Sequence, residues 1–310
     1  MGFLSAPAFG AEPAHPGTVN YIEGAAFLDG KPLNNRNVGN LALNAGDELT
    51  TANGKAEILL TPGIYLRVDD QSAVKMISPD LALTQVQVER GRAAVEVDQI
   101  FPQNDVRITD GGVETQLVKT GYYEFDANHP EAMVFHGRAE VEIGGGKYEA
   151  IKNHRELALV QDGRVKTVSF NAKGTGDDLY NWSSLRSEYL AEANNQIAGN
   201  YAEGPGFNPG WYWDPYAYDY TFIGMDPFYS PFGWGFYPWG GFYGGLYGAG
   251  FYGRGFYGHG FYGHGFRGAG GFHGDEGFHG GGGFHGGMGV GGGFHGGGGG
   301  FHGGGMRGGR

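Results

Sequence analysis

Cysteine is absent from the 310 residues. This absence excludes disulfides, cysteine-ligated zinc, iron–sulfur clusters and thiol catalysis. No apolar run approaches the roughly 20 residues that a membrane-spanning helix needs. Basic residues are also few, since 21 Lys and Arg face 33 Asp and Glu, for a net charge of −12. Without a basic stripe to meet phosphates, nucleic acid is not an expected partner.

Aliphatic residues become scarce towards the C-terminus, where 43 of the 64 glycines lie at or beyond Gly204. A glycine-rich chain loses much backbone entropy on ordering and has little apolar surface to bury in return. We therefore expect the folded part to end near residue 200. Residues 241–310 are predicted to form a disordered, Gly/Phe/His-rich tail.

The body of the chain, residues 17–170, has the pattern of short strands separated by turns. Apolar residues fall on alternate positions in several runs, for example Ile64, Leu66 and Val68, Leu81 and Leu83, and Val86 and Val88. Such alternation, with turns every 8–12 residues, is typical of an antiparallel all-β domain. The pairs Asp29-Gly30 and Asn53-Gly54 favour tight hairpins. The fold class is thus all-β, as a β sandwich or a wound β-stack of about a dozen strands.

One helix is predicted in segment 171–204, directly after the strands. Trp182, Leu185, Tyr189, Ala193 and Ile197 recur at helical spacing on one face. The acids at 177 and 178 suit a helix N-terminus, and the glycine at 199 is a candidate C-terminal stop. The apolar face requires a cover. An edge or open face of the β domain would provide it, and the alternative is a partner protein.

Catalytic residues are not evident. The acids Asp47-Glu48 and Asp69-Asp70 lie at predicted turns, where solvated side chains are the expected state. The histidines of the strand-rich part, His129, His136 and His154, show no ligand spacing. Since no nucleophile with a base and no closed metal site emerges, we predict a protein that is not an enzyme and has no obligate cofactor.

Segment 205–240 is rich in Trp, Tyr and Pro. Its prolines disfavour regular structure, yet it carries too much apolar surface for a plain linker. Two interpretations stay open. The segment wraps the β domain, or it forms an aromatic strip that binds a polysaccharide or the cell wall.

The tail repeats Phe-His pairs in glycine at irregular intervals. Its histidines could gather Zn²⁺, Ni²⁺ or Cu²⁺ loosely as neutral imidazoles, although glycine linkers pre-organise nothing. The candidate metal ligands are His259, His264, His273, His279, His285, His295 and His302. Alternating aromatic and glycine residues are also the composition of a weakly adhesive, multivalent chain. That hypothesis predicts self-association or contact with an envelope component. A third alternative is a spacer.

Several stretches resemble the FecR-type domain of bacterial envelope proteins. They read TANGKAEILLTPGIYLRVDDQSAVKM at 51–76, VQVERGRAAVEV at 86–97 and MVFHGRAEVEI at 133–143. The resemblance covers roughly residues 47–162. It extends to exported members without a membrane anchor through GTVNYIEG at 17–24 and LYNWSSLRSEYLAEAN at 179–194.

The resemblance implies an extracytoplasmic, non-enzymatic β domain. The signalling through a membrane helix that the family also contains is not expected here, because neither a membrane helix nor a cytoplasmic segment precedes the β pattern. Residues 1–16 are predicted to be disordered, either as the small-residue end of a truncated signal peptide, which the resemblance favours, or as an ordinary disordered N-terminus. The expected function is that of an envelope scaffold or interaction protein in the periplasm or cell envelope. The alternative is sequestration or sensing of divalent metal through the tail.

Overall fold

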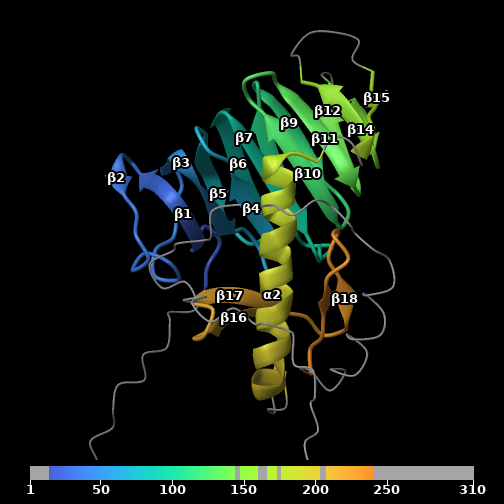
Figure 1. Ribbon diagram of the computed structural model, residues 1–310. Coiled ribbons are helices and arrows are strands. Elements are labelled where there is room, and N and C mark those ends of the chain that lie inside the picture. The colour runs from blue at the N-terminus through green and yellow to red at the C-terminus, as the bar shows by residue number, and fades with distance from the viewer. Residues whose placement is uncertain (1–13, 144–146, 160–165, 173–175, 203–206, 240–310) are drawn as a thin grey trace, which may run out of the picture. The chain divides into compact units, whose positions relative to one another are not determined.

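The computed structural model describes residues 14–143, 147–159, 166–172, 176–202 and 207–239 (Figure 1). The signal-like N-terminus and the Gly/Phe/His-rich tail lie outside these residues. Within the described part, no helix combines the length and apolarity needed to cross a membrane.

The strands of the body follow one another closely in sequence. They are β1 (Val19–Leu28), β2 (Lys31–Pro32), β3 (Glu48–Leu59), β4 (Ile64–Val68), β5 (Ala73–Pro79), β6 (Leu83–Arg90), β7 (Arg92–Val97), β8 (Asp105–Asp110), β9 (Val113–Leu117), β10 (Gly121–Asp126), β11 (Glu131–His136), β12 (Arg138–Glu142), β13 (Tyr148–Lys152), β14 (Arg155–Ala158) and β15 (Val168–Ser169). The one long helix of the described part is α2 (Asp178–Ala202), and β16 (Gly210–Asp214), β17 (Asp219–Ile223), β18 (Phe228–Tyr229) and β19 (Gly235–Phe236) come after it. The all-β fold class with one helix is confirmed.

The strands of the body form one continuous sheet. Its order is β13-β12-β9-β8-β6-β5-β3-β4-β7-β10-β11-β14-β15, and β1 pairs with both β3 and β2. Among the described strands, neighbours pair antiparallel except β6 and β8, which are parallel with Val86 opposite Ile108. The predicted antiparallel arrangement is therefore right apart from this pair.

A single apolar core lies on one face of the sheet. It takes side chains from strands at both ends of the strand order, including Ile151 of β13 and Leu157 of β14, as well as Leu66 from the centre. Because one sheet contributes to one core along its whole length, it must curl around that core. The wound form, rather than a sandwich of two separate sheets, is what this chain adopts.

Two of the glycine-containing turn signals have different outcomes. Asp29 and Gly30, with φ of 48° and 73°, join β1 to β2 in the tight hairpin that their sequence predicts. The prediction of a hairpin at Asn53-Gly54 is wrong, because both residues lie inside β3. A Cβ on Gly54 would come within 2.2 Å of the Glu23 carbonyl oxygen. Glycine is needed here for close approach of β1 and β3.

The alternation around β6 is also shifted from its expected frame. Thr84, Val86 and Val88 are buried, whereas Leu81 and Leu83 are 52% and 40% exposed. The core-facing frame of β6 thus begins at Thr84, since residues of a strand alternate between the two faces of a sheet.

Helix α2 starts where its sequence indicates but ends later. The Asp177 carboxylate accepts a hydrogen bond from the Tyr180 N–H at 3.0 Å, which is an N-cap contact. The stop predicted at Gly199 is wrong, because the helix continues to Ala202. Of the predicted apolar face, Trp182, Ala193 and Ile197 are buried, but Leu185 is only half-buried and Tyr189 is 44% exposed.

The buried face of α2 is partly polar. It contains Ser183, Arg186, Ser187 and Asn194, which are all buried. The face is rotated relative to the apolar stripe because the sheet surface beneath it carries charged side chains, which need polar partners.

Segment 207–239 forms two short hairpins, β16–β17 and β18–β19. Regular structure was not expected from its proline content, but the prolines lie outside the strands and leave the strand pairing intact. The expectation that the folded part ends near residue 200 is therefore wrong. Phe222 and Phe236 of the hairpins pack with Leu190 of α2 and with Leu59 and Tyr65 of the sheet. The described part of this segment therefore packs on the β domain, and Figure 1 shows α2 and the β16–β17 hairpin next to each other.

Candidate functional site

The outer face of the central strands carries a buried group of charges. Arg67 of β4 donates from Nε to Glu57 Oε2 of β3 at 2.9 Å and also pairs with Glu96 of β7. All three side chains are fully buried. Alternation along these strands places their charged residues on the face opposite the apolar core.

Arg186 of α2, the helix that packs on this face of the sheet, completes the group. Its Nη2 lies 2.9 Å from Glu57 Oε1 and 2.9 Å from Asp219 Oδ2 of β17. Ser187, one residue along the helix, donates to Glu96 at 2.6 Å. A single arginine thus ties the sheet, the helix and the first hairpin together.

The charges of this group set the protonation of its carboxyl groups. Burial opposes ionisation of Glu57, but the guanidiniums of Arg186 and Arg67 outweigh it and lower the Glu57 pKa to about 2. For Asp219, burial is stronger than the attraction of Arg186 and raises its pKa to about 6. Glu57 is therefore an ionised structural carboxylate whose charge is balanced by two arginines, and it is not suited to accept a proton as a base.

A second group of charges fixes the start of α2. Arg92 pairs with Glu124 at 2.7 Å and with Asp177. Lys55 pairs with Asp178 at 2.9 Å and with Asp69. The expectation that Asp69 is a solvated turn acid is wrong, since Asp69 is 6% exposed and takes part in this contact. It is buried because the helix N-terminus covers the turn that carries it.

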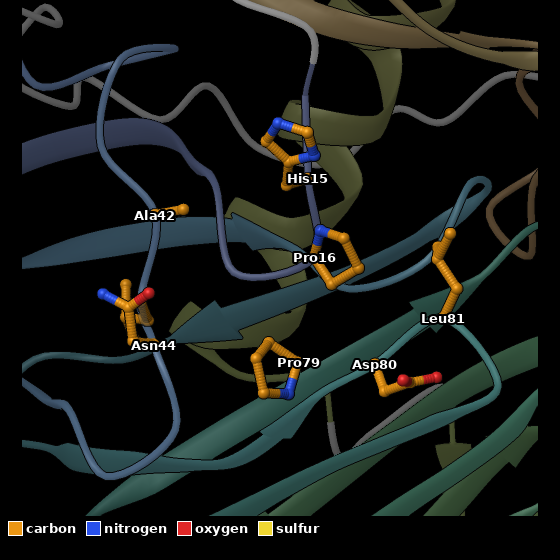
Figure 2. Close-up of a pocket in the computed structure, with 8 residues that line it drawn as sticks. His15, Pro16, Ala42, Asn44, Pro79, Asp80 and Leu81 are labelled. Carbon is orange, nitrogen blue, oxygen red and sulfur yellow. The ribbon is translucent and has the colours of Figure 1, made fainter.

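An open hollow of about 540 Å³ lies between residues 15–16, residues 42–44 and the β5–β6 turn. Figure 2 shows His15, Asn44 and Asp80 around it, with the His15 ring and the Asp80 carboxylate pointing in different directions. Asp80 accepts a hydrogen bond from the Ala82 N–H of its own turn at 2.7 Å. The polar groups of the hollow do not converge on one point, as an acid–base pair would need.

The histidines of the body do not form a metal centre. The rings of His136 and His154 are 5.7 Å apart, and burial together with the nearby His154 lowers the pKa of His136. His129 is exposed beside Asp126. In the described ranges no three His, Cys, Asp or Glu side chains come together as a metal site. The predicted tail ligands, His259, His264, His273, His279, His285, His295 and His302, lie outside those ranges.

Exposed aromatic side chains gather in a different part of the chain. We call Tyr189, Tyr201, Tyr216, Tyr218, Tyr229 and Trp239 the exposed aromatic set. Its members belong to α2 and segment 207–239, and the two most exposed are Tyr216 at 74% and Tyr218 at 65%. The sequence located this aromatic segment, but no sequence signal separated the rings that pack on the sheet from those that face solvent.

Comparisons with known proteins give little further guidance. No protein-family model matches the chain, and no curated protein matches it. Two solved structures, both of a candidate anti-sigma factor from Parabacteroides distasonis, are similar, with TM-scores of 0.34 and 0.35 and identities of 11% and 10%. They cover 40% and 41% of this chain, which spans 59% and 61% of their length. A likeness of this degree carries no functional argument.

Proposed function

We propose that this chain is a non-catalytic, extracytoplasmic interaction protein of the cell envelope. In this proposal the β domain and α2 are the scaffold, and the exposed aromatic set is the surface that meets the partner. The location rests on the FecR-type sequence resemblance and the signal-like N-terminus.

The observation that carries the proposal is that some aromatic side chains of segment 207–239 are buried and others are exposed to solvent. Phe222 and Phe236 are fully buried against the helix and sheet, while Tyr216, Tyr218 and Tyr229 are each more than 60% exposed. Exposed tyrosine and tryptophan on a firmly packed segment supply large contact area at low entropic cost, and both are enriched at interfaces.

The charged residues support the same function. The buried charged side chains pair with one another and hold α2 on the sheet; they are Arg186, Glu57, Glu96 and Arg67. Through Asp219 they hold the β16–β17 hairpin in place, so Tyr216 and Tyr218 of the exposed set project from a fixed base. Such pre-organisation lowers the entropy lost on binding.

Retention on isolated bacterial envelopes tests this function. The full-length protein should co-sediment with envelope material, and the triple variant Tyr216→Ala, Tyr229→Ala, Trp239→Ala should lose most of that retention. Tyr148→Ala is the matched control, because Tyr148 is 57% exposed but lies on β13. Retention that is equal in the triple variant and the wild type would disprove the role of the aromatic set. If the wild type were not retained, the function itself would be wrong.

A further inference from the structure

The tip of the β16–β17 hairpin displays two tyrosine rings that the fold does not require. The turn connects Asp214 to Asp219, which pair across the two strands. Asp214 holds the turn itself, since its carboxylate accepts the Tyr216 N–H at 2.8 Å and its carbonyl oxygen accepts the Tyr218 N–H at 2.9 Å. The turn is therefore fixed by backbone and aspartate contacts, and the rings of Tyr216 and Tyr218 take no part in these contacts.

Tyr218 sits in a backbone conformation that disfavours it. Its φ is 57°, in the left-handed region where glycine or asparagine is usual. A bulky residue there is strained, and such strain concentrates at functional positions. The ring of Tyr218 makes one edge contact with Trp213, at 6.2 Å between centroids. Stability alone thus gives little reason for a tyrosine at this position.

An asparagine-rich loop lies against the same hairpin. The Trp213 ring packs on Gly39 so closely that a Cβ there would come within 2.6 Å of it. The loop around Gly39 carries Asn34, Asn35, Asn37 and Asn40. The side-chain oxygens of Asn34 and Asn37 accept backbone N–H groups at 2.9 and 2.8 Å, which leaves their NH2 groups as donors.

Charge is scarce at this junction. In residues 33–41 and 213–220 the ionisable acids, Asp214 and Asp219, are buried, and Arg36 is the exposed cation. A surface of phenol rings and amides with little charge is poorly matched to nucleic acid or to a strongly charged protein. It matches a ligand that offers apolar ring faces and many hydroxyl groups.

We infer that the hairpin tip, formed by Trp213, Tyr216 and Tyr218, and the neighbouring loop 34–40 are a binding site for a polysaccharide. The tyrosine rings would lie against pyranose faces, and the side-chain amides of Asn34 and Asn37 would donate to hydroxyl or acetamido oxygens. This inference rests on the proposed envelope function and identifies the chemical class of the partner.

The test uses the full-length chain and two defined probes, the hexamers of β-1,4-linked N-acetylglucosamine and β-1,4-linked glucose. Calorimetry and chemical-shift titration should show saturable binding of at least one probe. Tyr216→Ala and Tyr218→Gly should each weaken it about fivefold to tenfold, which is the usual effect of truncating an interface aromatic. Tyr148→Ala should leave it unchanged.

The Tyr218→Gly variant separates binding from folding. Glycine relieves the left-handed strain, so thermal stability should stay within a few degrees of the wild type while binding falls. Absence of binding to both hexamers, or binding that survives both tip substitutions, overturns the inference. If the envelopes still retain the protein and neither hexamer competes, the partner is not a polysaccharide of this kind and the envelope function stands.

Discussion

Arg186 offers the sharpest test of how the layers are held together. Its guanidinium is 3% exposed and pairs at 2.9 Å with both Glu57 and Asp219. Replacement by methionine keeps the apolar stem but leaves the buried Asp219 carboxylate without its arginine and leaves Glu57 with Arg67 alone. Removing one partner from a buried ion pair costs about 3–5 kcal/mol. For a domain of this size that lowers the melting temperature by roughly 10 °C at pH 7.

The pH dependence of the Arg186→Met variant adds a second readout. In the native protein the Glu57 pKa is about 2 against an ordinary 4.5, so this group contributes stability above pH 4.5 that is lost as pH falls towards 2. Without Arg186, burial moves the pKa of Asp219 further above its present value of about 6, and the pKa of Glu57 rises because Arg67 is the one arginine left to oppose burial. The folded variant then takes up protons that the unfolded chain does not hold. Its stability should rise as pH falls from 7.5 to 5, and the gap to the wild type should narrow.

Denaturant and thermal unfolding at pH 5, 6 and 7.5 measure both effects. Arg90→Met is the control, because Arg90 lies on the exposed end of β6 and a surface substitution changes stability by at most about 0.5 kcal/mol. The double variant Arg186→Met, Asp219→Asn should recover part of the loss at pH 7.5, since one stranded charge is gone. A destabilisation that is small, or the same at every pH, would refute the view that Arg186 neutralises buried carboxylates.

Three further outcomes are expected. The Asn194 side chain donates to the Phe222 carbonyl and accepts the Tyr237 N–H, each at 2.8 Å. Asn194→Ala leaves both backbone groups without this partner, which costs about 1–3 kcal/mol of stability per buried group, so limited proteolysis within 224–239 should become faster. Unchanged cleavage would contradict that role. Gly24→Ala, whose new Cβ would lie 2.2 Å from the Asn53 carbonyl oxygen, should lower the melting temperature far more than Gly30→Ala, where nothing lies within 4 Å. Similar losses in the two variants would disprove the close approach of β1 and β3 at Gly24. The metal alternative predicts that the full chain binds Zn²⁺ and that this binding disappears when the seven tail histidines become asparagine. Binding should also disappear near pH 5, where imidazoles with a pKa of about 6.5 are protonated. Equal calorimetric titrations of the wild type and the histidine variant would exclude these histidines as ligands.

The sequence by itself determined the class of the fold and the position of some of its turns and of the start of α2. Alternating apolar residues such as Ile64 and Leu66 predicted strands, because a pleated strand places every second side chain on the same face. The Asp29-Gly30 pair predicted its hairpin, and Asp177 predicted the start of α2. These features are local, since each depends on the conformational preferences of a few neighbouring residues.

Tertiary structure decided what covers the outer face of the sheet. Asp69 looks like a solvated turn residue in sequence, but it is buried, as is Arg67, once α2 and the hairpins lie on that face. The rotation of the helix towards Arg186 follows from charges on strands far away in sequence. In the same way, the exposure of Tyr216 and the burial of Phe222 depend on which rings meet the sheet. No local pattern encodes these pairings, because the energy of a buried charge or ring is set by the partners that folding brings to it.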